Sequence, residues 1–301
     1  MRDIKACINI LSSRTKCLPV SLKSFQEKWN YKYDYPVYVH YFDDIYDDPK
    51  LRKAIVEFTG LKDLTFISIP YWSPPELPES EMFYNRKDLW YVNTGRFGPS
   101  RKGFLHMNRF FNNLYGYPKT EFEKYDYILS FDDEALFLKE VPYNFFEVME
   151  ERPEPCGAIK IVFPHIKPPH QGNFDCRVGM KDFVIDYVNK HNIKTESEFI
   201  NNLLQNPTEE YFHNNLIVAD SWVFKTEVFK SDAWKQWSDA VRESHGIFKY
   251  RWGDCELNVL FFLIHYGCLP YDFKTVDEGY HDQGGLRHVQ GYAPSIKDFH
   301  K

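Results

Sequence analysis

The sequence lacks a hydrophobic run long enough to cross a membrane. None of its 301 residues belongs to an apolar stretch approaching the ~20 residues that a spanning helix needs. The opening residues Met1 to Lys5 lead directly into a strand-like run, without the apolar core of a signal peptide. We therefore expect no membrane span in this chain.

Paired cysteine motifs are also missing. The sequence contains no CxxC pair and no Cys/His spacing typical of a zinc site. An even number of cysteines leaves disulfides open, but we expect reduced and mostly buried thiols. The six are Cys7, Cys17, Cys156, Cys176, Cys255 and Cys268.

Basic residues are fewer than acidic ones. With 37 Lys and Arg against 43 Asp and Glu, the formal net charge is −6, which argues against broad nucleic-acid binding. A local basic patch stays possible. Aromatic residues, in contrast, make up 18% of the chain, and we expect many of their rings to be half exposed and to line grooves as well as fill the core.

Strand-like segments alternate with helical ones, and no internal repeat is present. Apolar runs predict strands, and spacings of three and four residues predict helices. This alternation indicates an α/β fold with a mainly parallel central sheet. The predicted strands cover residues 6–11, 35–42, 64–69, 127–131, 157–163 and 216–224, and the predicted helices cover 18–29, 49–59, 104–115, 181–191, 196–205, 226–244 and 256–266. Between them, 70–102 is rich in proline and predicts a long covering loop.

Polar side chains follow several of these strands where each one ends. Ser12, Ser13 and Arg14 come after the first strand, and Asp43 and Asp44 end the second. In open α/β sheets ligands gather at the carboxyl ends of the strands. We therefore predict a binding site at this edge.

The acidic triplet Asp132, Asp133 and Glu134 is the strongest chemical signal. It ends an apolar strand abruptly, and three carboxylates at one strand end are costly to desolvate unless a cation offsets their charge. Hard divalent ions such as Mn²⁺ and Mg²⁺ prefer carboxylate oxygens and often keep phosphates as further ligands. The triplet predicts a metal site for a nucleotide diphosphate; the alternative is a solvent-exposed turn capped by acids.

Four more residues are candidates for a role in the site. Arg109 is either a solvated helix charge or a guanidinium directed at phosphates. Asp220, in a polar pair that interrupts a strand, suggests a ligand above it. Asp254 is either the N-cap of the following helix or a general base. His281, in a glycine-flanked turn, is a metal ligand, a donor to a pyrophosphate or a surface histidine.

Together these blocks resemble glycosyltransferase family 15, the fungal Golgi α-mannosyltransferases, and related nucleotide-sugar transferases of the GT-A fold. The similarity lies in the segment from Ser21 to Pro36, His106-Met-Asn-Arg-Phe110, Lys124-Tyr-Asp-Tyr127 with the acidic triplet, Tyr250-Arg-Trp-Gly-Asp254 and Gly279-Tyr-His281. The blocks span most of the chain in family order, and Arg-Trp-Gly-Asp and His-Met-x-Arg-Phe are the most specific.

The resemblance implies one GT-A catalytic domain over residues 1–301, with a nucleotide-binding half at 1–140 and an acceptor-binding half at 141–301. It implies that Asp132 and Glu134 hold Mn²⁺ or Mg²⁺, that His281 completes the coordination, and that Asp254 meets the acceptor hydroxyl. The nucleotide sugar is then a co-substrate. The residues expected to contact it are Ser12, Arg14, Asp43, Arg109, Asp132 and Asp133.

One departure from the family pattern concerns the reaction itself. An Asn-Phe-Glu block of the mannosyltransferases supplies a carboxylate under the donor sugar, whereas this chain has Asn215, Leu216 and Ile217 at that place. Asp220 is a substitute three residues on, or the reaction proceeds without a protein nucleophile. Retaining and inverting schemes therefore both stay open.

We thus predict a glycosyltransferase that moves a hexose or pentose from GDP-mannose or a UDP-sugar to a glycan hydroxyl, with Asp254 as the base. The rivals are a non-catalytic carbohydrate-binding protein, with Trp72, Trp90, Trp222 and Trp252 as stacking rings, and a nucleotide-sugar phosphohydrolase. The sequence as given suggests the cytoplasm; the Golgi lumen is the alternative if an anchor precedes it.

Overall fold

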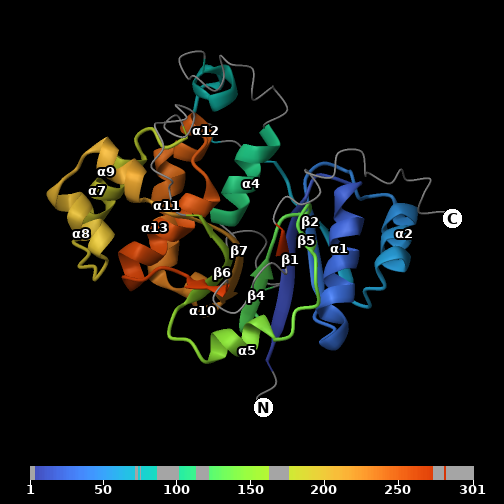
Figure 1. Cartoon of the computed structure of the whole chain (residues 1–301). Coiled ribbons are helices and arrows are strands. Elements are labelled where there is room, and N and C mark those ends of the chain that lie inside the picture. Colours follow the sequence, from blue (N-terminus) through green and yellow to red (C-terminus); the bar gives the residue numbers. More distant parts are fainter. Residues whose placement is uncertain are drawn as a thin grey trace.

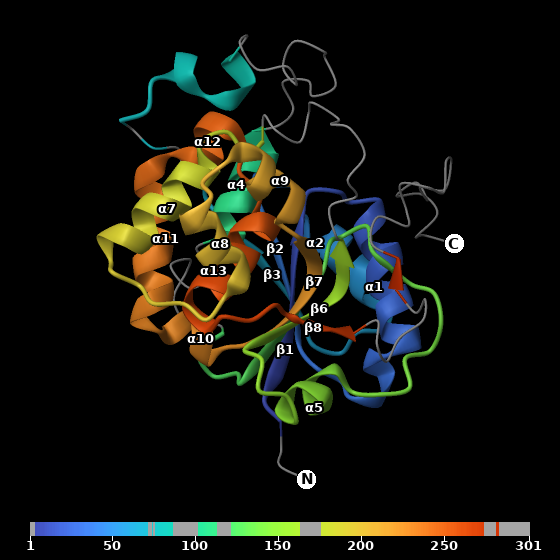
Figure 2. The same cartoon turned by 60° about the vertical axis from the view of Figure 1, so that its left-hand side comes forward.

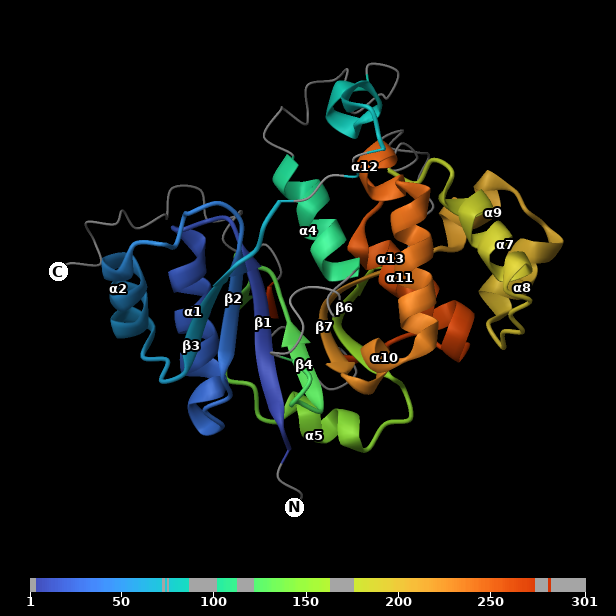
Figure 3. The same cartoon turned by 180° about the vertical axis from the view of Figure 1, so that it is seen from behind.

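The computed structural model describes residues 4–71, 74, 76–86, 102–112, 122–162, 176–273 and 281–282. Its centre is a seven-stranded sheet in the order β3-β2-β1-β4-β7-β6-β8, seen across the middle of Figure 3. The strands are β1 (Ala6–Ser12), β2 (Val37–Tyr41), β3 (Leu64–Ser68), β4 (Tyr127–Ser130), β6 (Cys156–Val162), β7 (Val218–Lys225) and β8 (Tyr271–Asp272).

All strands of this sheet except β7 run in one direction. The pairs β1–β2, β2–β3, β1–β4 and β6–β8 are parallel, whereas β7 is antiparallel to both β4 and β6. The mainly parallel sheet predicted from the sequence is therefore confirmed. Because β4 and β6 run alike, their carboxyl ends lie at the same edge as those of β1 and β2.

Helices cover both faces of the sheet (Figure 1). Ile8 and Ile10 of β1 point to the core under α1 (Cys17–Lys28), where they join Phe25, while Cys7 points to the opposite core. The alternation follows from the period of two along a strand. The first face carries α1 and α2 (Pro49–Thr59), and the second carries α4 (Lys102–Asn112), α11 (Asp232–Ser244) and α13 (Asp254–Tyr266).

The remaining helices lie around this frame. A group formed by α7 (Met180–Lys190), α8 (Glu198–Gln205) and α9 (Glu209–Asn215) stands on the outer side of α11 and α13 (Figure 2). The others are short: α5 (Phe145–Glu150), α10 (Glu227–Lys230), α12 (Gly246–Tyr250), and the 3₁₀ turns η1 (Asn30–Lys32), η2 (Glu79–Glu81) and η3 (Phe83–Asn85). A small second sheet pairs β5 (Leu136–Phe137) with β9 (His281–Asp282).

Local signals explain where helices begin and end. The Asp48 side chain accepts a hydrogen bond from the Lys50 amide at the start of α2, and Gly60 ends the helix with φ of 71°. The single helix predicted at 226–244 is in fact two, because Ser231 is extended there (φ −75°, ψ 148°) and caps α11 through the Trp234 amide. Of the predicted loop at 70–102, the described part contains η2 and η3.

Aromatic rings fill the two cores, and many others are half exposed, as the sequence predicted; Tyr33, Phe66 and Phe183 are examples. Trp29 and Trp237 are fully buried, and the large aromatic side chains that are exposed among the described residues are Tyr31, Tyr71 and Tyr266. The six cysteines, all within the described residues, are free thiols. None of the described helices has the length and apolar character to cross a membrane.

Candidate active site

A cavity of about 320 Å³ opens at the carboxyl edge of the sheet. Its walls come from the loop after β4, from β6 and β7, from α4, and from the start of α13 with the turn before it. It is lined by Phe104, Met107, Asp132, Glu134, Lys160, Cys176, Val218, Asp220, Arg251, Gly253, Asp254, Cys255 and Glu256. Four of the residues predicted from the sequence, Asp132, Glu134, Asp220 and Asp254, therefore meet in one place.

Strand register explains why acids distant in sequence come together. Ser130 of β4 is opposite Trp222 of β7, so continuing the same antiparallel register by two residues brings Asp132 opposite Asp220. Asp220 is in turn opposite Lys160 of β6. Opposed residues share one face of a sheet. Asp132, two residues after the end of β4, Asp220 on β7 and Lys160 on β6 thus line the cavity in a row.

The backbone at Asp220 is unusual. Ser221, next to it within β7, has φ of 54°, a left-handed conformation that is rare for a residue with a side chain. The Ser221 amide donates a hydrogen bond to Asp220 Oδ1 at 3.0 Å. Strained backbone is found preferentially at functional sites because the surrounding structure must hold it in place.

The cavity carboxylates repel one another. Burial, followed by the charges of Asp220, Asp133 and Asp254, raises the pKa of Asp132 well above its usual range. Burial, followed by the charges of Asp220 and Glu256, raises the pKa of Asp254 to about 7. The carboxylates in the cavity wall outnumber the cationic side chains there, Lys160 and Arg251. A bound cation would reduce this repulsion and so stabilise the site.

Asp254 is the first residue of α13, and Gly253 takes the N-cap position. A Cβ at Gly253 would lie 2.3 Å from Glu256 Oε2, so the turn accommodates only a glycine without a shift of that carboxylate. Glu256 is held by the buried Arg177, whose Nη2 lies 3.3 Å from Glu256 Oε1. The carboxylate of Asp254 is therefore presented to the cavity by a firmly packed helix start.

Several cavity residues escaped the sequence analysis. Arg251 belongs to the Arg-Trp-Gly-Asp block but was given no role; its φ is 64°, its guanidinium lies 3.8 Å from the Phe104 ring centroid, and its Nη1 donates to Cys176 Sγ at 3.1 Å. Lys160 interrupts an otherwise apolar strand. A charge within a buried run was the available signal for it.

Asp133 faces the loop after β1. Its Oδ2 accepts hydrogen bonds from Ser12 Oγ at 2.7 Å and from the amides of Ser13 and Arg14 at 3.2 Å, and its Oδ1 accepts from Arg14 Nη1 at 2.9 Å. Burial raises the pKa of Asp133, while Arg14 and Ser12 lower it. Arg14 also forms an ion pair with Glu134. Ser12, Arg14 and Asp133 therefore fasten the first loop to the acidic triplet.

Asp43 and Arg109 are not among the described residues that line the cavity. Asp43 is exposed, with φ of 60°, and accepts a hydrogen bond from the Tyr71 hydroxyl at 2.9 Å. Arg109 is 7% exposed and donates to the Pro70 carbonyl at 3.2 Å. The backbone of His281 pairs with Phe137, three residues after Glu134; its side chain lies outside the described part of the structure.

The residues present fit a hard divalent cation. Asp132 and Glu134 offer carboxylate oxygens to the same cavity, which Mn²⁺ and Mg²⁺ prefer. Within the described residues no three His, Cys, Asp or Glu side chains form a complete ligand set, so a further protein ligand would come from outside them. The sequence predicted His281 as this further ligand, and the backbone of His281 lies on β9, the strand that pairs with β5.

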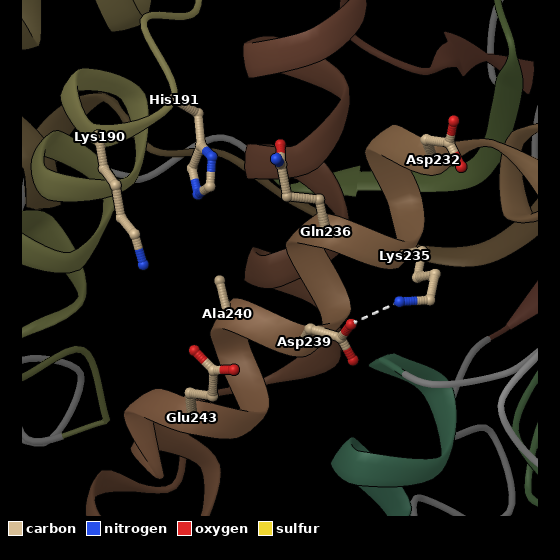
Figure 4. Close-up of a pocket in the computed structure, with 8 residues that line it drawn as sticks. All are labelled: Lys190, His191, Asp232, Lys235, Gln236, Asp239, Ala240 and Glu243. Carbon is tan, nitrogen blue, oxygen red and sulfur yellow. Dashed lines mark hydrogen bonds and ion pairs between the residues drawn. The ribbon is translucent and has the colours of Figure 1, made fainter.

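A second hollow, of about 400 Å³, lies between α7 and α11 (Figure 4). Lys190 and His191 face it from one side, and Gln236, Ala240 and Glu243 from the other. None of its lining residues follows a strand, and both signs of charge alternate along it. It shares no residue with the cavity at the sheet edge.

The family model described as glycolipid 2-alpha-mannosyltransferase matches residues 2–264. No curated protein sequence matches the chain.

Solved structures share the fold. The mannosyltransferase Ktr4p from S. cerevisiae in complex with GDP superposes with a TM-score of 0.68 at 16% identity, over 91% of this chain and 68% of that one. Core-mannan synthase A (CmsA/Ktr4) from Aspergillus fumigatus in its Mn/GDP form gives 0.66 at 17% identity, over 88% and 71%. A further Ktr4p structure gives 0.64 at 17%, over 86% of this chain and 65% of its own, so the chain spans just under two thirds of that protein. The solved structures confirm the GT-A fold, and the family model over residues 2–264 confirms the family expected from the sequence: the chain belongs to the glycolipid 2-alpha-mannosyltransferase family, glycosyltransferase family 15.

Proposed function

We propose that this protein is a metal-dependent glycosyltransferase that moves a sugar from a nucleotide sugar to a glycan hydroxyl. The observation that carries the proposal is the meeting of Asp132, Glu134, Asp220 and Asp254 in one cavity at the carboxyl edge of the sheet. GDP-mannose is the first donor to test, because the similar fungal mannosyltransferases are described with GDP and, in one case, Mn. UDP-sugars, of hexose or pentose, are the alternative.

The two halves of the chain contribute different parts of the site. The half at residues 1–140 supplies Asp132 and Glu134, and the half at 141–301 supplies Asp220 and Asp254. The central sheet joins them through the β4–β7 ladder. This arrangement supports a nucleotide-binding half and an acceptor-binding half within one domain.

Asp132 and Glu134, completed by His281, would hold Mn²⁺ or Mg²⁺. A bound ion there supplies positive charge against the diphosphate that leaves. The chain's own residues prepare this place: Arg14 holds Glu134 by an ion pair and Asp133 by a hydrogen bond, so the acidic triplet is fixed before a ligand arrives. Ser12 fastens the same loop through Asp133.

Asp254 would accept the proton of the acceptor hydroxyl. A general base works best when its pKa lies near the operating pH, and burial with neighbouring acids raises the pKa of Asp254 to about 7. Above that pH the carboxylate is ionised and can take the proton. The rate of transfer should therefore rise with pH as this carboxyl ionises.

The stereochemical outcome depends on Asp220. Ile217, at the family's carboxylate position, is 6% exposed and packs in the core, while its neighbour Val218 lines the cavity. Asp220 is thus the carboxylate that β7 presents. If Asp220 displaces the nucleoside diphosphate to form a glycosyl-enzyme and the acceptor hydroxyl then displaces Asp220, the two inversions leave the configuration retained. If Asp254 takes the proton of the hydroxyl as that oxygen displaces the diphosphate directly, the configuration is inverted. The anomeric configuration of the product, read by NMR, decides between the two.

The experiment that tests the function is the variant Asp254→Asn. We expect it to fold and to bind donor with Mn²⁺, but to lose about 10²- to 10⁴-fold in transfer rate, the usual contribution of a general base. Asp186→Asn, which changes an exposed carboxylate on α7, is the matched control. Transfer by Asp254→Asn at the rate of the control would remove Asp254 from the mechanism.

The two rival functions give different results in the same assay. A carbohydrate-binding protein would show neither transfer nor metal-dependent hydrolysis of a nucleotide sugar, and a phosphohydrolase would release sugar to water equally with and without acceptor. Two of the rings named for sugar stacking are core residues, since Trp222 is 4% and Trp252 2% exposed. Trp72 and Trp90 lie outside the described residues.

A further inference from the structure

Lys160 is the one lysine among the residues that line the cavity. It lies on β6, its side chain is half buried, and its neighbours along the strand, Ile159 and Ile161, are each 5% exposed. Lysine is seldom placed within a buried strand, because removing its ammonium from water is costly without a partner.

Within the described residues, the Lys160 ammonium makes no hydrogen bond and no ion pair. Directly opposed residues on antiparallel strands have Cβ atoms about 5 Å apart, within easy reach of a lysine and an aspartate. Lys160 and Asp220 are so opposed, yet the two do not form an ion pair. The three donors of this ammonium are therefore available to whatever fills the cavity.

The row Asp132, Asp220 and Lys160 gives the direction in which a donor would lie. Neighbouring strands are about 4.8 Å apart, so the β6 backbone at Lys160 lies roughly 10 Å from the end of β4. If Asp132 holds the metal and the diphosphate, Asp220 is the next carboxylate in the row and would face the anomeric carbon. The far edge of the sugar ring, which carries the oxygens on C3, C4 and C6, would then point toward Lys160.

We propose that Lys160 is a specificity-determining residue that donates hydrogen bonds to the oxygens on the edge of the donor sugar opposite its anomeric carbon. This inference rests on the proposed function and deepens it. A site built to donate to a sugar oxygen discriminates strongly against analogues that lack the oxygen, because its buried donor is then left without an acceptor. Lys160 therefore favours a hexose over a pentose or a deoxy sugar.

The test separates the sugar from the diphosphate. Binding of GDP-mannose and of GDP, each with Mn²⁺, is measured by calorimetry for the wild type, Lys160→Met and Lys160→Arg. Methionine has nearly the length of lysine but no donor, and arginine keeps the charge. Lys190→Met, which changes an exposed lysine in the hollow between α7 and α11, is the control.

We expect Lys160→Met to bind GDP-mannose about 10- to 100-fold more weakly, as for loss of a hydrogen bond from a charged donor, with GDP binding unchanged. Lys160→Arg should recover part of the loss. The 4-deoxy and 6-deoxy analogues of GDP-mannose should locate the contact. The analogue that lacks the oxygen bonded by Lys160 should bind to the wild type and to Lys160→Met with the same affinity.

Three outcomes would overturn the inference. An equal loss for GDP and GDP-mannose would show that Lys160 contacts the diphosphate, and no loss for either would show that it contacts neither. If the wild type binds UDP-glucose in place of GDP-mannose, the same comparison is made with UDP-glucose and UDP. Wild-type protein that binds no nucleotide sugar would refute the proposed function itself, and this inference with it.

Discussion

The pKa of Asp254 makes a prediction about stability that needs no substrate. In the metal-free protein, burial and the charges of Asp220 and Glu256 raise this pKa from an ordinary value of 3.8 to about 7. The folded state therefore holds a proton between about pH 4 and pH 7 that the unfolded chain has released. The stability that this proton contributes is fully present below pH 3.8 and is lost as the pH rises through 7.

Replacing Asp254 with asparagine removes this loss. The pKa of Asp254 in the folded protein lies roughly three pH units above its ordinary value, and each of these corresponds to about 1.4 kcal/mol. The free energy of unfolding that is lost at high pH is therefore at most about 4 kcal/mol. Since the side chain is only partly buried, we expect Asp254→Asn to be about 2–4 kcal/mol more stable than the wild type at pH 8. At pH 5 the gain should be less than half as large, because only part of the titration lies below that pH.

Thermal unfolding in the presence of a chelator measures the effect. For a chain of this size the expected rise in Tm at pH 8 is about 4–8 °C. Asp44→Asn, at an exposed site, serves as the control. A difference between Asp254→Asn and wild type that stays constant from pH 5 to pH 8, or a variant that is less stable at pH 8, would refute the assignment of a raised pKa.

Three further predictions concern the metal and the fold. Glu134→Ala should weaken donor binding in the presence of Mn²⁺, because one of two cavity carboxylates expected to hold the ion is lost; calorimetry that shows unchanged affinity would contradict this role. Ser231→Ala should lower the free energy of unfolding by about 1 kcal/mol, since the cap on the Trp234 amide is lost, and a urea midpoint equal to that of the wild type would count against the cap. Gly157→Ala should cost about 1–3 kcal/mol in the same assay, because a Cβ there would lie 2.4 Å from the Phe273 ring; an unchanged midpoint would mean that the ring moves freely.

The sequence predicted the α/β architecture because its apolar runs record burial on both faces of a sheet. The helix at 49–59 was predicted with the bounds that the structure has, since Pro49 and Gly60 mark its two ends chemically. The break between α10 and α11 within 226–244 was not predicted, because a serine such as Ser231 is compatible with a helix interior. Its role as a cap depends on the chain turning there.

Candidate site residues divided in a similar way. Asp132, Glu134, Asp220 and Asp254 were chosen for their chemistry at the ends and interruptions of apolar segments, and they meet in one cavity. Lys160 was missed, because its importance comes from lying opposite Asp220 across an antiparallel ladder. Strand direction and register depend on how distant segments pack, which local pattern does not record.

The amino-acid sequence by itself determined the order of strands and helices, the family, and the concentration of acids where strands end. Only the tertiary structure decided that Asp133 faces Ser12 and Arg14, whereas Asp132 and Glu134 face the cavity. It also decided that burial and neighbouring acids raise the pKa of Asp254 to about 7. The physical reason is that both properties depend on burial and on residues distant in sequence, Ser12 and Arg14 for Asp133 and Asp220 for Asp254, which come close only once the sheet has formed.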